Sequence, residues 1–363
     1  MSLKAAFVMP GVGVVGRGAE AFVVELCTAL AERHGFEVTL FCRGPAPIPW
    51  QRVRALPRDA RWVNRLYSAS RLGRKVFDTF FLDPLSLEWY TAALSALPFL
   101  WRGGFDVVVM EGGLIGAWCC RLLRRLRGVP FVDIAHGQDP KWEGAFARQR
   151  PDRVVAFTEA ARRMIRERAP EANVVVIPHG IDLGRFRPDV PPVPLDLPRP
   201  VVLCAGAVDA HKRMNLAVEA VARLGGSLVV LGEGPEAEAV DRLAAQRLPG
   251  RYLRRVVPRA EMPGWYAAAD CFTLPSRTES FGLTYLEALA CGLPCVAPDD
   301  PVRREVIGEA GLCCDVTDLD AYAGALAAAL ARDWGEIPRR RAEGFPIEAT
   351  IDRYAELLRE LKR

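Results

Sequence analysis

The chain has 363 residues, of which 50% are hydrophobic and 25% are charged, and its formal net charge is +4. This length allows two domains of ordinary size, and this composition is typical of a globular protein. No apolar run reaches the roughly 20 residues that a membrane-spanning helix needs, and the net charge is too small to indicate nucleic-acid binding. The 10 cysteines form no Cys-x2-Cys pair, which favours buried thiols in a reducing cytosol over disulfides or a zinc site.

The N-terminal segment has the pattern of a strand, a glycine-rich loop and a helix. In the loop, Gly11, Gly13 and Gly16 match the dinucleotide fingerprint Gly-x-Gly-x-x-Gly. The next strand, over 37–42, ends in Arg43 rather than in an acidic residue, which argues against NAD and leaves NADP open. Two interpretations therefore remain for the loop itself: the cofactor site of an NADP-dependent oxidoreductase, or a plain glycine-rich turn.

Residues 43–104 interrupt the alternation of strands and helices. Within them the segment 51–75 carries eight basic residues against one acid, Asp59, with Trp62 and Leu66 interleaved. Such a segment fits either a solvated basic surface on a variable insertion or a contact with anionic lipid or an anionic acceptor.

The alternation returns after this insertion, and the strand predicted over 130–135 ends in His136. A histidine just beyond the C-terminal end of a parallel strand lies where open α/β sheets bind ligands. The alternative is an imidazole that is hydrogen-bonded to local backbone. Further on, the segment 188–200 holds six prolines in thirteen residues, which predicts a stiff connection between two domains.

A second series of strands and helices follows this connection. Its first strand, over 201–205, leads into Gly206 and then into Lys212 and Arg213 at the start of a helix. Two cations at a helix N-terminus are electrostatically unfavourable unless an anion compensates them. The pattern therefore indicates a diphosphate partner.

The most informative stretch surrounds a helix predicted over about 282–291. The helix is apolar almost all round and therefore buried, and Glu287 is the single charge in 281–298. Because a buried carboxylate without a partner is costly, Glu287 is either paired within the protein or accepts hydrogen bonds from ligand hydroxyls. Glu279 precedes the same helix, whose N–H groups suit an anion. An anion flanked by two carboxylates that bind hydroxyls fits a sugar nucleotide.

Glu279 and Glu287 are separated by seven residues, with Phe-Gly-Leu after the first and Ala-Leu-Ala-Cys-Gly-Leu-Pro after the second. This Glu-x7-Glu motif resembles that of the retaining glycosyltransferases of family four. The resemblance implies the GT-B fold, an α/β architecture in which two Rossmann-like βαβ domains face each other across a cleft. The implied division is 1–188 as an acceptor-binding domain, 189–200 as a linker, 201–346 as the domain that binds the donor, and 347–363 as a helix that packs back on the first domain.

The resemblance also implies a reaction. A hexose moves from a UDP- or GDP-linked donor to a hydroxyl of a glycan, a lipid or a small molecule, with retention of configuration. Neither a metal nor another cofactor is expected, nucleic acid is not a partner, and the protein is expected in the cytoplasm or at a membrane that it contacts through 51–75. The residues assigned to catalysis are His136, Glu279 and Lys212. Those assigned to donor binding are Arg213, Ser280, Phe281, Gly282, Leu283, Glu287, Gly18 and Gly206.

Two further sequence features bear on the NADP hypothesis and on the expected absence of a metal. The NADP hypothesis would explain the glycine loop but not Lys212, Glu279 or the helix after Phe281. The run Asp318-Leu319-Asp320 has the spacing of a metal-binding motif, but it opens a helix, so we expect it to be a cap.

Overall fold

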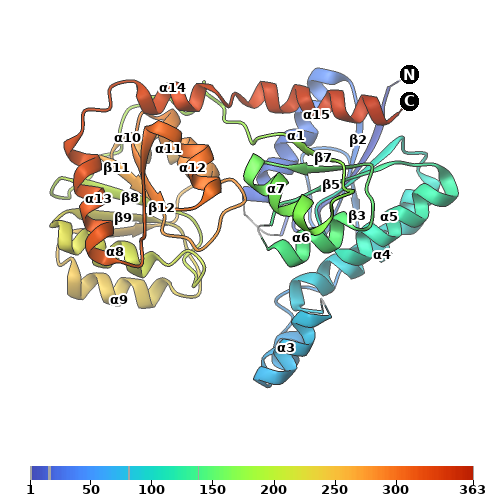
Figure 1. Ribbon diagram of the computed structural model, residues 1–363, viewed down its shortest axis with the longest axis horizontal. Coiled ribbons are helices and arrows are strands. Elements are labelled where there is room, and N and C mark those ends of the chain that lie inside the picture. Colours follow the sequence, from blue (N-terminus) through green and yellow to red (C-terminus); the bar gives the residue numbers. More distant parts are fainter. Residues whose placement is uncertain (1, 15–17, 81, 138, 363) are drawn as a thin grey trace. The chain divides into compact units, whose positions relative to one another are not determined.

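The computed structural model describes residues 2–14, 18–80, 82–137 and 139–362, without the side chains of residues 71–73 and 76 (Figure 1). It divides into two compact units. The first comprises residues 1–157, 161–177 and 351–363, and the second comprises residues 158–160 and 178–350. Each unit is a parallel sheet with helices on both faces, which confirms the predicted α/β class.

Among the described residues, the sheet of the first unit has seven parallel strands in the order β3-β2-β1-β4-β5-β6-β7. Their bounds are β1 Lys4–Val8, β2 Glu37–Cys42, β3 Trp50–Arg52, β4 Val107–Met110, β5 Phe131–Ile134, β6 Arg153–Ala156 and β7 Val174–Val176. The order reverses between β1 and β4. In open α/β sheets such a reversal marks the crevice in which ligands bind.

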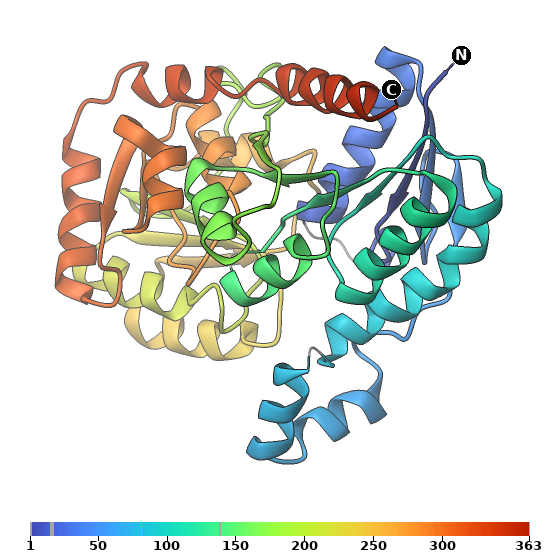
Figure 2. The ribbon, with the colours of Figure 1, turned by 45° about the vertical axis from the view of Figure 1, so that its right-hand side comes forward.

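Helices cover both faces of this sheet (Figures 1 and 2). One face carries α4 (Pro84–Arg102), α5 (Leu114–Arg127) and α6 (Pro140–Ala147), and the other carries α1 (Gly18–His34) and the C-terminal part of α15 (Ile347–Leu361). A further helix, α7 (Glu159–Arg168), lies between β6 and β7 in the chain. Because both faces are covered, β4 is a continuous apolar run with every residue buried.

The C-terminal part of α15 is fixed to the first unit by named contacts. The ring of Tyr354 lies 6.0 Å from that of Phe22 in α1. Asp352 lies 3.0 Å from His34, and Lys362, just beyond the helix, pairs with Asp106 at 2.9 Å.

The interrupted region contains regular structure of its own. Strand β3 pairs in parallel with β2 at the edge of the sheet, and α2 (Arg61–Ser68) and α3 (Arg71–Thr79) project from the first unit ahead of the long helix α4 (Figure 2). Helix α4 begins at Pro84, and the Asp83 carboxylate accepts hydrogen bonds from the N–H groups of Leu85 and Ser86. Among the residues that the structure covers, no helix has both the length and the apolar character needed to cross a bilayer.

The second sheet has six described strands in the order β10-β9-β8-β11-β12-β13. Their bounds are β8 Val201–Ala205, β9 Ser227–Leu231, β10 Tyr252–Arg255, β11 Cys271–Thr273, β12 Cys295–Pro298 and β13 Gly311–Cys314. Helices α8 (Met214–Leu224), α9 (Ala237–Arg247) and α13 (Leu319–Ala331) cover one face, and α10 (Met262–Ala267), α11 (Leu283–Ala290) and α12 (Pro301–Ile307) cover the other (Figure 1). A short turn of 3-10 helix at Gly308–Ala310 and helix α14 (Ile337–Glu343) complete the unit.

The order of the second sheet reverses between β8 and β11. The expected cap at Asp318 is confirmed, because its carboxylate accepts hydrogen bonds from the N–H groups of Asp320 and Ala321 at the start of α13.

Candidate functional site

The predicted site residues fall into two groups. Gly18, the first residue of α1, and His136 lie in the first unit. The second unit holds Gly206, Lys212, Arg213, Glu279, Ser280, Phe281, Gly282, Leu283 and Glu287. Most of the second group lies in the loops after β8 and β11, the two strands that flank the reversal of the sheet. This is the place where an open α/β sheet binds ligands.

Consecutive side chains of the first loop contact the second loop. The Nε2–H of His211 donates to the carbonyl oxygen of Thr278 at 2.8 Å. Next to it, the Lys212 ammonium donates to Oε1 of Glu279 at 2.5 Å, and both side chains are largely buried, with 21% and 12% exposed. A charge-assisted hydrogen bond of this kind is stronger than a neutral one. It therefore fixes a cation and a carboxylate side by side at the ligand-binding edge of the sheet.

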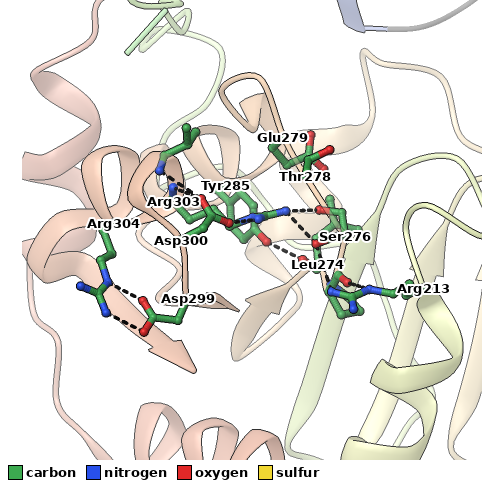
Figure 3. Close-up of polar contacts among 12 residues, drawn as sticks. Arg213, Leu274, Ser276, Thr278, Glu279, Tyr285, Asp299, Asp300, Arg303 and Arg304 are labelled. Atoms are coloured by element: carbon green, nitrogen blue, oxygen red, sulfur yellow. Dashed lines mark hydrogen bonds and ion pairs between the residues drawn. The ribbon is translucent and has the colours of Figure 1, made fainter. Parts of the chain in front are cut away.

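Arg213 is held in an unusual backbone conformation by the same pair of loops. Its φ is 52°, in the left-handed region that residues other than glycine rarely adopt. Its Nε–H donates to the carbonyl oxygen of Pro275 at 2.7 Å, and a terminal N–H donates to that of Ser276 at 3.3 Å (Figure 3). Burial lowers the pKa of Arg213, and the nearby charges of Arg277 and Arg303 lower it further. This crowding of cations is what a bound anion would relieve.

The loop after β11 ends at Gly282, the residue that precedes α11. Gly282 has φ 90°, and a Cβ atom there would lie 2.7 Å from the ring of Tyr285, so glycine is required. The Phe281 ring is buried between those of His179, 5.5 Å away, and Phe345, 5.7 Å away. Among the described residues, no side chain caps the N-terminus of α11. This helix start therefore offers N–H groups to a ligand.

Arg303 holds the loop after β11 through hydrogen bonds to Ser276. The sequence analysis did not identify this residue. Its side chain is fully buried, and one terminal nitrogen donates to the carbonyl oxygen of Ser276 at 2.8 Å and to its hydroxyl at 2.7 Å (Figure 3). Its other terminal nitrogen pairs with the carboxylate of Asp300. The Tyr285 hydroxyl donates to the carbonyl oxygen of Leu274 in the same network. The sequence carries no signal that separates this arginine from its exposed neighbour, because both follow an acidic turn.

Glu287 has a partner within the protein. It lies in α11 with 6% of its surface exposed, and Oε2 accepts a hydrogen bond from the Tyr266 hydroxyl at 2.8 Å. Burial raises the pKa of Tyr266, and the neighbouring carboxylate raises it further. Arg259 lies 4.0 Å from the other oxygen of Glu287. Tyr266 therefore satisfies part of the hydrogen-bonding capacity of the Glu287 carboxylate. Binding of ligand hydroxyls by Glu287 remains a prediction.

In the first unit, His136 follows β5 and contacts a carboxylate that the sequence analysis did not single out. Its Nε2 lies 2.9 Å from Oε2 of Glu111, which directly follows β4. The His136 ring also makes edge contacts with the rings of Phe157 and Phe22, at centroid distances of 5.0 and 6.3 Å. The carboxylate contact differs from the backbone-bonded alternative considered for this histidine.

The described glycines of the fingerprint loop serve close contacts within the protein. A Cβ at Gly11 would lie 2.2 Å from a carboxylate oxygen of Glu20. Gly13 has φ 75°, and a Cβ there would lie 2.5 Å from the backbone of Gly44. The third glycine, Gly16, lies outside the described residues.

Arg43, the cation of the NADP hypothesis, pairs with a buried carboxylate. Glu88 in α4 has a fully buried side chain and accepts hydrogen bonds from both Arg43 and Arg58. An arginine committed to a buried acid is poorly suited to hold a 2′-phosphate, because its release would remove one of the two partners of that carboxylate. The oxidoreductase hypothesis is not supported.

Two Rossmann-like units, with a cation and a carboxylate fixed at the sheet reversal of the second, define a two-domain α/β protein of the GT-B type. The family model described as Glycosyltransferase Family 4 matches residues 16–185, and that described as Glycosyl transferases group 1 matches residues 199–332. The chain belongs to this family of glycosyltransferases, as the motif analysis predicted.

Comparison with individual proteins agrees with this membership. The chain is 31% identical over 366 residues to a D-inositol 3-phosphate glycosyltransferase of Xylanimonas cellulosilytica, covering 89% of this chain and 85% of the relative. It is 32% identical over 196 residues to a GDP-mannose-dependent alpha-(1-6)-phosphatidylinositol monomannoside mannosyltransferase of Mycolicibacterium smegmatis, covering 48% of this chain and 50% of that relative. An Anabaena protein solved in complex with UDP and glucose has a similar fold, with a TM-score of 0.73, 16% identity and coverage of 98% and 99%.

Proposed function

We propose that the protein transfers a hexose from a nucleoside diphosphate sugar to an acceptor hydroxyl, with retention of configuration and without a metal ion. The observation that carries the proposal is the Lys212–Glu279 pair beside the uncapped start of α11, at the reversal of the second sheet. On this proposal residues 201–346 bind the donor and residues 1–188 bind the acceptor, with 189–200 as the linker and 347–363 packed on the first domain.

The leaving diphosphate is stabilised by groups of the second unit. As the bond to the sugar breaks, negative charge grows on the diphosphate, and preorganised donors lower the energy of that transition state. Lys212 supplies a positive charge, and the N–H groups of Phe281, Gly282 and Leu283 supply hydrogen bonds at the positive end of the helix dipole. Arg213 contributes to the positive potential while its guanidinium holds the loop that carries Glu279.

The carboxylates bind hydroxyls of the donor. Glu279 accepts hydrogen bonds from the transferred sugar, and its contact with Lys212 places that sugar next to the diphosphate. Glu287 accepts hydrogen bonds from the ribose hydroxyls, and Ser280 adds a hydroxyl in the same loop. His136 binds the transferred sugar from the first unit. Gly206 and Gly18 allow the donor to approach the backbone closely.

UDP and GDP are the proposed nucleotide carriers. The Mycolicibacterium relative is named as dependent on GDP-mannose, and the Anabaena protein was solved with UDP and glucose. The acceptor is a hydroxyl of a glycan, a lipid or a small molecule.

We further propose that 51–75 binds an anionic membrane surface. Helix α2 exposes 60% of Trp62 and 55% of Leu66, and Arg61 and Arg65 on the same helix are exposed as well. Basic side chains next to an aromatic anchor suit the interface of an anionic bilayer.

Binding of nucleotides tests the donor proposal. The melting temperature would be measured with UDP, GDP, ADP and NADPH. At a ligand concentration of about 100 times Kd, binding stabilises the folded state by about 2.7 kcal/mol. We expect UDP or GDP to raise the melting temperature and NADPH to leave it unchanged. Stabilisation by NADPH alone would contradict the proposal.

A further inference from the structure

The first unit holds a histidine–carboxylate pair at the place where its own sheet reverses. Strand order changes direction between β1 and β4, and Glu111 is the residue directly after β4. His136 follows β5, which pairs with β4, and the two side chains meet at 2.9 Å between Nε2 and Oε2. The pair therefore lies at the edge of the sheet where ligands are expected.

The two partners differ in their access to solvent. The side chain of His136 is 18% exposed, whereas that of Glu111 is 1% exposed. The Phe157 and Phe22 rings restrict the imidazole from two further directions. A ligand can therefore reach the ring but not the carboxylate behind it.

Glu111 is costly to bury. Desolvation raises its pKa, His136 counteracts this shift, and the carboxylate of Glu20 adds to it. Neither of its carboxylate oxygens meets hydrogen-bond geometry with a described residue, so its contact with His136 rests on the 2.9 Å separation of Nε2 and Oε2. Asp133, with its pKa raised by burial to about 7, lies nearby. Burying a carboxylate costs folding free energy unless the carboxylate is paired. Groups with shifted pKa values are concentrated at functional sites.

We propose that Glu111 is a positioning residue for glycosyl transfer. It accepts the Nε2–H of His136, holds the proton on that nitrogen and fixes the orientation in which the ring meets the transferred sugar. The proposal rests on the proposed role of His136 in binding that sugar.

Nuclear magnetic resonance tests the positioning directly, without any activity. The chain has four histidines, so the ring nitrogens can be resolved and assigned with a His136→Asn variant. In Glu111→Met, which keeps the length but cannot accept the hydrogen bond, the tautomer fixed on Nε2 should be lost. Asp133→Asn removes a buried carboxylate that interacts with His136 electrostatically but is not its contact at Nε2, so it should leave the proton of the ring on Nε2. Unchanged His136 signals in Glu111→Met would overturn the proposal.

Kinetics and stability distinguish positioning from a merely structural role. Glu111→Met should lower kcat at least about tenfold, as expected when a group that orients a histidine is removed, with donor KM little changed. Glu111→Gln should retain more activity, because its amide oxygen still accepts the hydrogen bond. The free energy of unfolding should be larger for Glu111→Met than for Glu111→Gln, because an apolar side chain suits the buried position better than an amide does. Activity that follows stability across the two variants would contradict the proposal.

A double-mutant cycle completes the test. In a His136→Ala background, Glu111→Met should have no further effect on kcat. Additive losses would show that Glu111 acts independently of His136 and would overturn the proposal. Loss of the proposed function itself is seen separately, as a wild-type protein that turns over no donor, and the resonance measurement still decides whether Glu111 positions the ring.

Discussion

The Lys212 ammonium donates a hydrogen bond to the Glu279 carboxylate at 2.5 Å, and this contact joins the loops that follow β8 and β11. The pair is largely withdrawn from solvent, and α11 begins four residues beyond Glu279, at Leu283. A cation, a carboxylate and a helix N-terminus are thereby gathered at one edge of the sheet. Together they can hold a diphosphate and the hydroxyls of a sugar.

Replacement of Lys212 tests the stabilisation of the leaving group. Lys212→Met should lower kcat roughly 100- to 1,000-fold, the loss seen when one preorganised donor to a developing anion is removed. Because the single change leaves Glu279 without its partner, stability should fall as well.

The double variant Lys212→Met with Glu279→Gln separates these two effects. It leaves no unpaired charge, so its melting temperature should return toward that of the wild type while turnover stays low. Turnover that recovered together with stability would assign the pair a purely structural role.

Replacement of Glu287 tests the ribose contact. Glu287→Gln should weaken binding of the nucleoside diphosphate by about tenfold, within the range for a hydrogen bond to a charged group. The wild type should bind the diphosphate more tightly than its 2′,3′-dideoxy analogue, and Glu287→Gln should lose this preference. Isothermal titration calorimetry measures both affinities.

Tyr266→Phe is the matched control for Glu287. It removes the internal hydrogen bond to the carboxylate but leaves the carboxylate itself in place. The variant should keep the preference for the ribose hydroxyls. If the dideoxy analogue binds the wild type as well as the parent nucleotide does, Glu287 has no role in holding the ribose.

Arg303 and Arg304 form a natural pair of variants on α12 (Figure 3). Arg303 is fully buried and pairs with Asp300, whereas Arg304 is 66% exposed and pairs with Asp299. Arg303→Met should lower the free energy of unfolding by about 3 kcal/mol or more, because it breaks a buried pair and leaves Ser276 without its donor. Arg304→Met should cost less than about 1 kcal/mol. Urea unfolding measures both, and equal losses would contradict the assigned difference.

Flotation with liposomes tests the membrane proposal for 51–75. The wild type should float with vesicles that contain anionic lipid, and a variant with Arg61→Ser, Trp62→Ser, Arg65→Ser and Leu66→Ser should not. Each cation near an anionic surface contributes about 1 kcal/mol, and binding should weaken as salt rises.

Two exposed arginines of the second unit provide the control for flotation. Arg242→Ser with Arg340→Ser removes the same number of positive charges elsewhere on the surface. This protein should float like the wild type. Equal flotation of the four-residue variant and the wild type would leave the segment as a solvated surface.

The sequence predicts the strands best where both faces of a sheet are covered. The strands Glu37–Cys42 and Val201–Ala205 match their predicted bounds, because buried parallel strands are largely apolar. Strand β3 was missed because it has three residues at the sheet edge and only the middle one is partly buried. Helix α4 was also missed, although Asp83 and Pro84 form a recognisable start signal.

The sequence predicts those residues of the site that have a recognisable local context, but not the contacts between them. Lys212 and Glu279 each stand out by their local context, but their contact joins positions 67 residues apart and depends on the order of the strands. Arg303 and Glu111 carry no local pattern that distinguishes them from surface charges. Their importance comes from burial and from the partners that the fold brings to them.

The most direct test of the proposed reaction is the release of nucleoside diphosphate from a panel of UDP- and GDP-hexoses, measured in the presence of EDTA. We expect one donor to be turned over at a rate that EDTA does not change and that an acceptor hydroxyl increases. We also expect the anomeric configuration of the product to match that of the donor. Turnover that EDTA abolishes and manganese restores, or inversion in the product, would contradict the metal-free retaining transfer proposed for this protein.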